Sequence, residues 1–576
     1  MGGAGMNRDR RAAPARLRRF LRICSPHRSR RFVVCSPAMD WKNRLYFGDN
    51  LDILRHEVRD SSVDLIYLDP PFNSNASYNV LFKEKSGEES AAQITAFEDT
   101  WQWSTEVEAV YKEIVTSGPR KLADLMQALL AFLGRNDMMA YLVMMAIRLV
   151  ELHRVLKTTG SIYLHCDPTA SHYLKLVMDA VFEPQNYINE VTWKRTTAHS
   201  DAKQGRRAFG NVIDVLLFYA KGQEYTFHFQ HADYSPEYLK KYSYVDADGR
   251  RYRLDNLTGP GGAAKGNPSY QVMGITRFWR YSKEKMQQLI DQGRIVQTKP
   301  GSVPQYKRYL DEMPGVPLQN LWDDIFPINS QAQERLGYPT QKPEALLERI
   351  IKASSSEGDI VLDPFCGCGT AIAVAEKLKR RWIGIDVTYL AINLVQRRLR
   401  DTFQNDLCPY EIIGAPKDLQ SAEALKEISP HQFEWWAVDL VNARPAKDHK
   451  KGADTGIDGY INFFDDKSGQ AKQVIVQVKS GYIGVNHVRD LKGVLDREKA
   501  AIGALITLRE PTKPMLTEAA ATGFYESKDF PGRYPRLQIL TVAELLAGRK
   551  LEYPAHRVET FAKAAHKTKT EQEEMF

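Results

Sequence analysis

Short apolar runs alternate with amphipathic stretches in the first part of the chain. Residues 63–68 (VDLIYL) form an apolar run that ends abruptly at Asp69-Pro70-Pro71, a pattern typical of a buried parallel strand that leads into a loop. The periodicity that follows predicts a helical stretch, a second strand and another helix over residues 120–157, 161–165 and 173–182. This alternation predicts an α/β fold with a doubly wound sheet.

The alternation stops at a long segment and then resumes. Residues from about 196 to 320 are polar, aromatic and rich in Gly and Pro, and we interpret them as an insert. Beyond the insert the pattern predicts a helix, a strand, a helix and a strand over residues 345–353, 360–362, 371–379 and 382–385. We therefore expect a Rossmann-like domain at 39–409, a linker at 410–430, a smaller α/β domain at 431–550 and a polar tail at 551–576.

The composition is typical of globular proteins. Of the 576 residues, 43% are hydrophobic and 26% are charged, which excludes a chain that is disordered throughout. The longest uninterrupted apolar run, Met138–Ile147, is much shorter than the roughly 20 residues of a membrane helix. We therefore expect no membrane contact. The six cysteines are too few for a disulfide scaffold and indicate a reducing compartment.

The net charge of +8 comes from residues 1–38. This segment holds ten arginines and one acidic residue, so the rest of the chain is close to neutral, and any contact with nucleic acid must come from local basic patches. The segment lacks the apolar core of a secretory signal. We interpret it as a disordered extension upstream of a translation start at Met39, with an organellar transit peptide as the alternative.

A glycine-containing turn predicts a cofactor site. Residues 363–370 (DPFCGCGT) lie between a predicted strand and a helix, and Asp386 ends the next strand 19 residues after Gly367, where a carboxylate can bind two ribose hydroxyls. Ile372 replaces the third glycine of the dinucleotide fingerprint, and no phosphate-binding loop follows. The pattern favours S-adenosylmethionine over NAD or ATP, although the turn alone is equally typical of a tight strand-to-helix connection.

Asp69-Pro70-Pro71-Phe72 predicts chemistry at an amino group. The lone pair of a base amino group is delocalised into the ring, which makes the nitrogen a poor nucleophile. A carboxylate at Asp69 and a rigidly held carbonyl at Pro70 can each accept one N–H, which turns the lone pair out of the ring plane. Phe72 can stack on a base that has left the duplex. Standing alone, these four residues are also typical of a surface turn.

Together the two motifs resemble the DNA amino-methyltransferases that modify adenine N6 or cytosine N4, over residues of about 40–405. The order of catalytic motif, insert and cofactor motif resembles the circularly permuted beta class. The resemblance implies that residues 48–51 line the cofactor adenine, that residues 340–343 lie near its methionine end and that the insert recognises the target. The cofactor-binding residues implied are Asp49, Asn50, Lys342, Asp363, Phe365, Gly367, Gly369, Thr370 and Asp386.

The resemblance also indicates which base is methylated. Asp is commoner than Ser at the first position of the catalytic motif in adenine N6 enzymes, so Asp69 favours adenine and cytosine N4 is the alternative. Cytosine C5 methylation is disfavoured because it needs a nucleophilic Cys, usually in a Pro-Cys pair that the chain lacks. The implied partner is double-stranded DNA with a flipped base. A homodimer is left open, and the implied location is the bacterial cytoplasm at the nucleoid.

Residues 431–550 resemble the Mrr-like restriction endonucleases. Asp458, Gln477 and Lys479 match that pattern, although Gln477 stands where the wider superfamily has an acid. The resemblance implies Mg²⁺ bound by Asp458 and Gln477, with Glu434 supplying a further charge and Lys479 acting on the scissile phosphate. We expect a site-specific DNA methyltransferase fused to a nuclease, as in restriction and modification. The alternative is a C-terminal module that binds DNA without cleaving it.

Overall fold

The computed structural model describes most of the chain from residue 42 onward. The described residues are 42–71, 102–196, 207, 209–329, 332, 334–336, 338, 340–446, 456–465, 471–527, 532–554 and 557–558. Phe72 and the predicted extension at 1–38 lie outside these residues. Among the residues that the structure describes, no helix is both long and apolar enough to cross a membrane.

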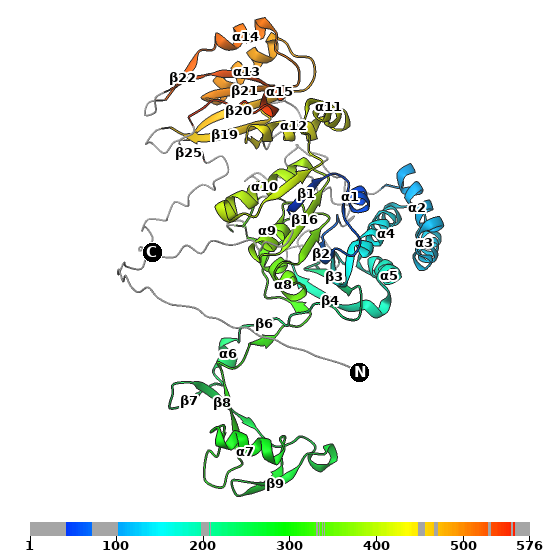
Figure 1. The fold of residues 1–576 in the computed structure, drawn as a ribbon, viewed down its shortest axis with the longest axis vertical. Coiled ribbons are helices and arrows are strands. Elements are labelled where there is room, and N and C mark those ends of the chain that lie inside the picture. The colour runs from blue at the N-terminus through cyan, green and yellow to red at the C-terminus, as the bar shows by residue number, and fades with distance from the viewer. Residues whose placement is uncertain are drawn as a thin grey trace, which may run out of the picture. The chain divides into compact units, whose positions relative to one another are not determined.

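A large sheet organises the first part of the described chain (Figure 1). Its strand order is β14-β4-β5-β3-β2-β15-β16-β1-β17. The strands are β1 (Asn43–Phe47), β2 (Val63–Leu68), β3 (Leu156–Cys166), β4 (Tyr187–Lys194), β5 (Ile213–Ala220), β14 (Leu321–Trp322), β15 (Ile360–Asp363), β16 (Arg381–Asp386) and β17 (Tyr410–Ile413). Neighbours from β3 to β17 are parallel, whereas β5 is antiparallel to β3 and β4. The predicted α/β class with a doubly wound sheet is confirmed.

The centre of this sheet joins two distant parts of the sequence. Strand β2 pairs with β15 in parallel, with Leu65 opposite Val361 and Ile66 opposite Leu362. Both strands are almost fully buried, which explains their continuous apolar sequences. Because both run in the same direction, their carboxyl ends reach the same edge of the sheet. Asp69 and Asp363, nearly 300 positions apart in the sequence, therefore come to that edge together.

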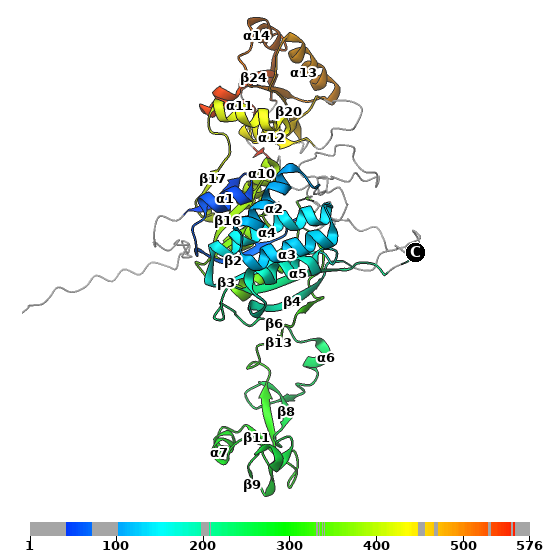
Figure 2. The ribbon, with the colours of Figure 1, turned by 90° about the vertical axis from the view of Figure 1, so that its right-hand side faces the viewer.

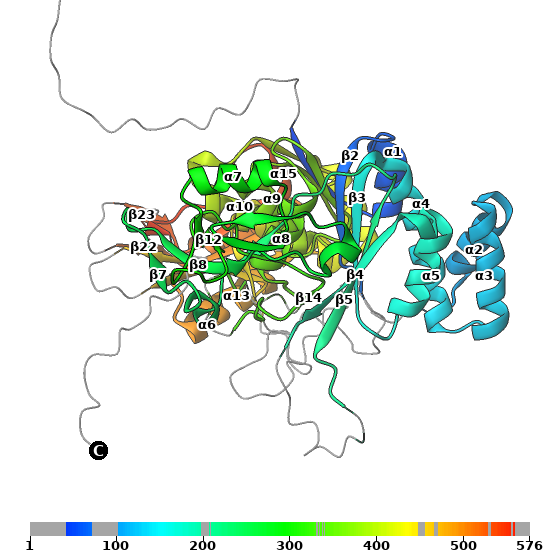
Figure 3. The ribbon, with the colours of Figure 1, turned by 90° about the horizontal axis from the view of Figure 1, so that it is seen from below.

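Helices cover both faces of the sheet. In Figure 3, α8, α9 and α10 lie on one side of the strands and α1, α4 and α5 on the other, and α2 and α3 pack on α4 and α5 (Figure 2). The helices are α1 (Asn50–Glu57), α2 (Thr105–Ser117), α3 (Arg120–Leu133), α4 (Asp137–Val155), α5 (Ser171–Phe182), α8 (Glu344–Ser354), α9 (Thr370–Lys377) and α10 (Tyr389–Phe403). The helical stretch predicted at 120–157 is divided at Gly134, whose φ of +72° ends α3.

Two segments differ from their predicted places. Residues 213–220, assigned from sequence to the insert, form β5 inside the large sheet. Their apolar run is buried between two antiparallel neighbours, so it belongs to the core although it follows a polar stretch. Residues 410–430, expected to be a linker, contain strand β17, which pairs with β1, and helix α11 (Leu419–Ile428).

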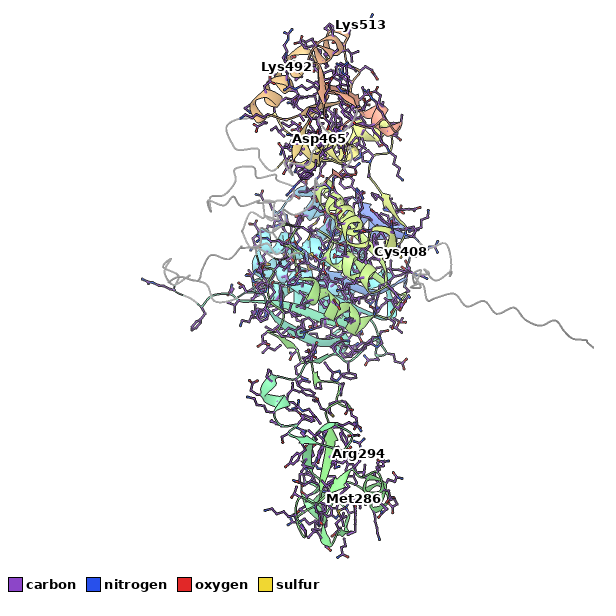
Figure 4. The ribbon with its side chains drawn as sticks, turned by 90° about the vertical axis from the view of Figure 1, so that its left-hand side faces the viewer. Met286, Arg294, Cys408, Asp465, Lys492 and Lys513 are labelled. Carbon is purple, nitrogen blue, oxygen red and sulfur yellow. The ribbon has the colours of Figure 1, made fainter. Side chains whose placement is uncertain are left out.

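Between β5 and α8 the chain forms a small substructure with its own core, drawn green in Figure 1. A four-stranded antiparallel sheet has the order β11-β12-β8-β7, and α7 packs with it around Trp279, Met286 and Leu289. Figure 4 labels Met286 in this core and Arg294, which ion-pairs with Glu312. The elements are β6 (His231–Ala232), α6 (Pro236–Leu239), β7 (Tyr244–Val245), β8 (Arg251–Asn256), β9 (Ser269–Val272), β10 (Ile275–Phe278), α7 (Lys283–Asp291), β11 (Ile295–Val296), β12 (Gln305–Tyr309) and β13 (Val316–Pro317).

The C-terminal part has a mixed sheet with the order β18-β19-β20-β21-β24, in which β25 also pairs with β19. Strands β20, β21 and β24 are parallel, and α13 and α14 pack on one face. Figure 4 labels Lys492 and Lys513 on these two helices. The elements are α12 (Pro430–Leu440), β18 (Arg444–Pro445), β19 (Gly459–Phe464), β20 (Lys472–Lys479), α13 (Val485–Glu498), β21 (Ile502–Thr507), α14 (Lys513–Ala520), β22 (Phe524–Glu526), β23 (Arg533–Pro535), β24 (Leu537–Thr541), α15 (Val542–Leu546) and β25 (Arg557–Val558).

Candidate functional site

A cavity of about 360 Å³ opens at the carboxyl edge of the large sheet, where β2 and β15 end. Both sequence motifs line it, and so do the segments that precede α1 and α8. The predicted site residues on its wall are Asp49, Asn50, Asp69, Pro70, Pro71, Lys342, Asp363, Phe365, Gly367, Thr370 and Asp386. Predicted residues from five separate stretches of sequence thus line one cavity.

The glycine-containing turn brings backbone close to the cavity. Gly367 has a φ of +48° and Gly369 a φ of +73°, the left-handed region that side chains rarely adopt. A Cβ at Gly369 would lie 2.8 Å from Val395 Cγ2, so the helix behind the turn excludes a side chain there. Helix α9 begins at Thr370 directly after the turn. Gly369, the predicted residue that does not line the cavity, shapes the turn.

Two carboxylates flank this turn, Asp363, which is buried, and Asp386, which is partly buried. Asp386 at the end of β16 accepts hydrogen bonds from the Gly367 N–H at 2.9 Å, and from the Thr388 N–H and hydroxyl at 2.9 and 2.8 Å. Burial raises the pKa of Asp386 in spite of these bonds. Asp363 accepts the Phe365 N–H at 3.1 Å, and burial raises its pKa well above the usual range. Both carboxylates are held by backbone at the cavity wall.

Arg148 on α4 organises the segment before α1 and was not predicted from the sequence. Its guanidinium donates to both carboxylate oxygens of Asp49, at 3.2 and 2.9 Å, and to Asn50 Oδ1 at 2.6 Å. Asn50 in turn donates to the Pro364 carbonyl at 2.8 Å, which links this segment to the cofactor motif. The available signal was a charged residue directly after the longest apolar run, Met138–Ile147.

Asp69 has two unlike oxygens. Its Oδ2 accepts from Lys342 Nζ at 2.5 Å, whereas Oδ1 is buried and has no hydrogen-bond partner among the described residues. The side chains of Asp69 and Lys342 are 16% and 12% exposed. Lys342, predicted to lie near the methionine end of the cofactor, therefore also anchors the Asp69 carboxylate. The remaining oxygen of Asp69 is an acceptor with unused capacity.

A cluster of polar residues close to Asp69 was also not predicted from the sequence. Tyr67, His165 and Asp214 come from β2, β3 and β5 and are at most 2% exposed. His165 contacts the Tyr67 hydroxyl at 2.9 Å and Asp214 at 3.2 Å, and Arg195 lies 3.2 Å from the second Asp214 oxygen. Each of these residues sits in or beside an apolar strand, where local sequence carries no sign of a polar cluster.

The residues predicted for the C-terminal site lie on or beside neighbouring strands. They differ in exposure and in hydrogen-bond partners. Asp458, just before β19, accepts the Val478 N–H at 2.6 Å, and its own N–H donates to the Val476 carbonyl. Gln477 is 4% exposed, and its Oε1 has no hydrogen-bond partner among the described residues. Lys479 is partly exposed at the end of β20.

Glu434, the other predicted metal ligand, lies on α12 with its carboxylate 3.4 Å from His431 Nδ1. Across the described part of the chain, no group of three or more His, Cys, Asp or Glu residues could hold a metal ion. The predicted Mg²⁺ site therefore gains no support from the placement of Asp458, Gln477 and Glu434.

Residues 429–547 match a family model described as NACHT-associated inactive Restriction Endonuclease 1. This agrees with a restriction-endonuclease-like domain in the C-terminal part and does not single out the Mrr-like group that the sequence resembles. The match covers about a fifth of the chain and shows a similarity to that family in this region.

The comparisons for the larger domain are with DNA methyltransferases. The Type II methyltransferase M.EcaI of Enterobacter cloacae is 27% identical over 419 residues, which cover 72% of this chain and 80% of that protein. The DNA adenine methyltransferase YhdJ of Escherichia coli (strain K12) is 52% identical over 81 residues, 14% of this chain and 27% of that protein. The solved PvuII DNA methyltransferase (cytosine-N4-specific) aligns over 62% of this chain and 87% of its own, with 12% identity and a TM-score of 0.33. Several other curated relatives are covered over about half of their length or less.

A family model for N6 and N4 methyltransferases, described as DNA methylase, matches residues 63–397. The match begins at β2, which carries Asp69 to the cavity, and ends in α10, beyond the glycine turn and Asp386. Because it spans more than half of the chain and includes both motifs that line the cavity, the chain belongs to the N6/N4 DNA methylase family.

Proposed function

We propose that this protein transfers a methyl group from S-adenosylmethionine to the N6 amino group of adenine in duplex DNA. The observation that carries the proposal is the state of the Asp69 carboxylate. One of its carboxylate oxygens is buried without a hydrogen-bond partner among the described residues, and the residue lines the same cavity as the glycine turn and Asp386. An acceptor with unused capacity beside a nucleoside-sized cavity fits a reaction at an amino group.

The residues around the cavity fit the proposed cofactor. A turn with two left-handed glycines leaves backbone accessible, and the Asp386 carboxylate beside it can accept from ribose hydroxyls while keeping its backbone bonds. Asp49, Asn50 and Phe365 line the same wall and would contact the rest of the nucleoside. When bound, the cofactor supplies a methyl group on a positively charged sulfur.

Asp69 and Pro70 prepare the amino nitrogen. The base must leave the duplex, which costs a few kcal/mol. Asp69 Oδ1 would accept one N–H and the Pro70 carbonyl the other, so that the nitrogen lone pair turns out of the ring plane. Lys342 holds Asp69 Oδ2 at 2.5 Å, which leaves Oδ1 for the base. Phe72, outside the described residues, is expected to stack on the base, and the insert between β5 and α8 is expected to read the target sequence.

Adenine is favoured over cytosine N4 by two observations. The first is the Asp at the opening of the catalytic motif, which the resemblance associates with adenine N6 enzymes. The second is the short, 52% identical match to a protein named as a DNA adenine methyltransferase.

The test is to incubate the purified protein with methyl-labelled S-adenosylmethionine and unmethylated DNA, and then to identify labelled nucleosides by mass spectrometry. We expect label in N6-methyladenosine, none with Asp69→Ala, and normal labelling with Asp124→Ala, which changes an exposed residue on α3. Label in N4-methylcytosine would replace the base assignment. No label in any nucleoside would overturn the proposal.

For the C-terminal domain we infer DNA binding without cleavage. Two features support this: Asp458 already uses one carboxylate oxygen on the Val478 N–H, and the second predicted ligand is the neutral Gln477. The similarity to a model described as inactive points the same way. The module would add to the affinity of the chain for DNA.

The test is to incubate the protein with methylated and unmethylated DNA and Mg²⁺, and to follow both cleavage and retention of DNA. We expect DNA to be retained but not cut, and a variant that lacks residues 429–576 to bind more weakly. Cleavage that Asp458→Ala abolishes would establish a nuclease in place of the binding module.

A further inference from the structure

Three buried polar side chains form a hydrogen-bonded series directly behind Asp69. The Tyr67 hydroxyl lies 2.9 Å from His165 Nδ1, and His165 Nε2 lies 3.2 Å from Asp214 Oδ2. The exposed fractions of the three residues are 2%, 0% and 1%. Burying a titratable ring and a carboxylate inside a sheet is costly unless they are paired, and the proposed reaction as described so far uses neither.

The protonation of this series follows from its surroundings. Burial by itself raises the pKa of Asp214, but the hydrogen bond from His165 and the charges of Lys342 and Arg195 lower the pKa below its usual value. Burial and the nearby carboxylates raise the pKa of Tyr67 well above its usual range. Asp214 is thus a carboxylate that accepts from His165 Nε2, and Tyr67 is a phenol that can donate to Nδ1.

His165 also faces the unused oxygen of Asp69. The distance between His165 Nδ1 and Asp69 Oδ1 is 4.0 Å, and this oxygen has no hydrogen-bond partner within the described residues. Other groups surround the imidazole: Tyr67 and Asp69 come from the β2 side, Asp214 from β5, Arg195 follows β4, and Trp193 packs an edge against the ring. His165 Nδ1 therefore lies near the carboxylate that would contact the base.

We propose that His165, backed by Asp214, takes up through Asp69 the proton that methyl transfer releases. This rests on the proposed function. In the transfer the amino nitrogen forms a bond to the methyl carbon, and the bond from that carbon to sulfur breaks with its electron pair remaining on sulfur. The nitrogen then carries one surplus proton, which passes to Asp69 Oδ1 and from there to His165 Nδ1, once the Tyr67 O–H has turned away from that nitrogen. The resulting imidazolium is stabilised by the Asp214 carboxylate, as in other buried His–Asp pairs.

The arrangement explains why Asp69 has two unlike oxygens. Lys342 fixes Oδ2, and Oδ1, the acceptor proposed for the base N–H, is left 4.0 Å from His165 Nδ1. Transfer of the proton to His165 returns Asp69 to the carboxylate form that the next amino group requires. His165 is a positioning residue that acts through Asp69, because it touches neither the base nor the cofactor.

The experiment measures methyl transfer in a single turnover, with enzyme in excess over unmethylated duplex, from neutral to alkaline pH. The variants are His165→Gln, Asp214→Asn and the matched control His153→Gln, which alters a partly buried histidine on α4. We expect His165→Gln to slow transfer roughly 100-fold at neutral pH and to regain rate as the pH rises, because hydroxide replaces the lost acceptor. Asp214→Asn should shift the pH profile in the same direction, and His153→Gln should match the wild type.

Cofactor binding by calorimetry separates this proposal from misfolding. If His165→Gln fails to bind cofactor, the pH profile of Asp214→Asn decides: an unshifted profile overturns the proton path. A wild-type rate and profile in His165→Gln would overturn it as well, and so would a loss of rate that neither alkaline pH nor added imidazole with His165→Gly restores. Absence of methyl transfer by the wild-type protein would instead count against the proposed function.

Discussion

The methyltransferase cavity and the predicted C-terminal site both have polar residues at or beside the ends of strands. The two sites differ in the hydrogen-bond partners of their carboxylates. Around the cavity, Asp69 keeps one oxygen without a partner among the described residues, and Asp363, which is buried, and Asp386, which is partly buried, both have raised pKa values. In the C-terminal domain, a carboxylate oxygen of Asp458 accepts a hydrogen bond from the Val478 N–H of the adjacent strand.

The difference shows how a reactive site can be told from a structural one. A carboxylate oxygen that accepts from the backbone of an adjacent strand stabilises the fold, whereas a buried carboxylate oxygen without a partner costs stability and can serve a ligand. The four predictions below test this contrast, from the largest expected effect to the smallest.

Asp69→Ala tests the unused oxygen directly. We expect methyl transfer to fall by roughly 10³-fold or more, since the variant removes both an N–H acceptor and the first proton acceptor. Cofactor affinity should change less than twofold, because Asp69 does not anchor the proposed cofactor. Single-turnover rates and calorimetry measure the two quantities, and transfer at the wild-type rate would remove Asp69 from the reaction.

Asp386→Ala tests the partly buried carboxylate beside the glycine turn. The lost charge-assisted hydrogen bonds to the ribose are worth about 1.5–3 kcal/mol, which corresponds to a roughly 10- to 150-fold rise in the cofactor dissociation constant. Calorimetry measures this rise. Asp401→Ala, on the exposed side of α10, is the matched control and should leave the constant unchanged. An unchanged constant in Asp386→Ala would mean that the ribose is held elsewhere.

Asp458→Ala tests the opposite role. The variant leaves the Val478 N–H without its acceptor, and we expect the free energy of unfolding of the C-terminal domain to fall by about 1–2 kcal/mol. Methyl transfer should be unaffected. Denaturant unfolding and a transfer assay on the same preparation check both statements, and an undiminished stability together with lost cleavage would identify a metal ligand instead.

Asp363→Asn gives the smallest effect and tests the cost of a buried carboxylate. Burial raises the pKa of Asp363 in the folded state above its unfolded value, so the wild type loses stability as the pH rises past about 4, where the unfolded chain ionises. Asn can still accept the Phe365 N–H and carries no charge. The melting temperature of the variant should therefore exceed that of the wild type at neutral pH, and the gap should close toward pH 4. A gap that does not depend on pH would contradict this explanation.

Local sequence determined much of the fold and the centre of the site. The apolar run at 63–68, the helix at 173–182 and the strands at 360–362 and 382–385 all appear within a few residues of their predicted places, because burial on a sheet or helix leaves a periodic signature. The two motifs could be located for the same reason, since each follows directly after such a strand.

Only the tertiary structure decided which polar residues from distant parts of the sequence lie in contact. Arg148, His165 and Asp214 lie within or beside apolar elements, and only the pairing of β2 with β3, β5 with β3 and α1 with α4 brings them to Asp49 and Asp69. The same holds for β5 and β17, whose membership in the large sheet depends on partners far away in the sequence. Periodicity reports whether a residue is buried, but strand order and register are set by contacts between distant segments, and these decide which partners a carboxylate such as Asp69 or Asp458 finds.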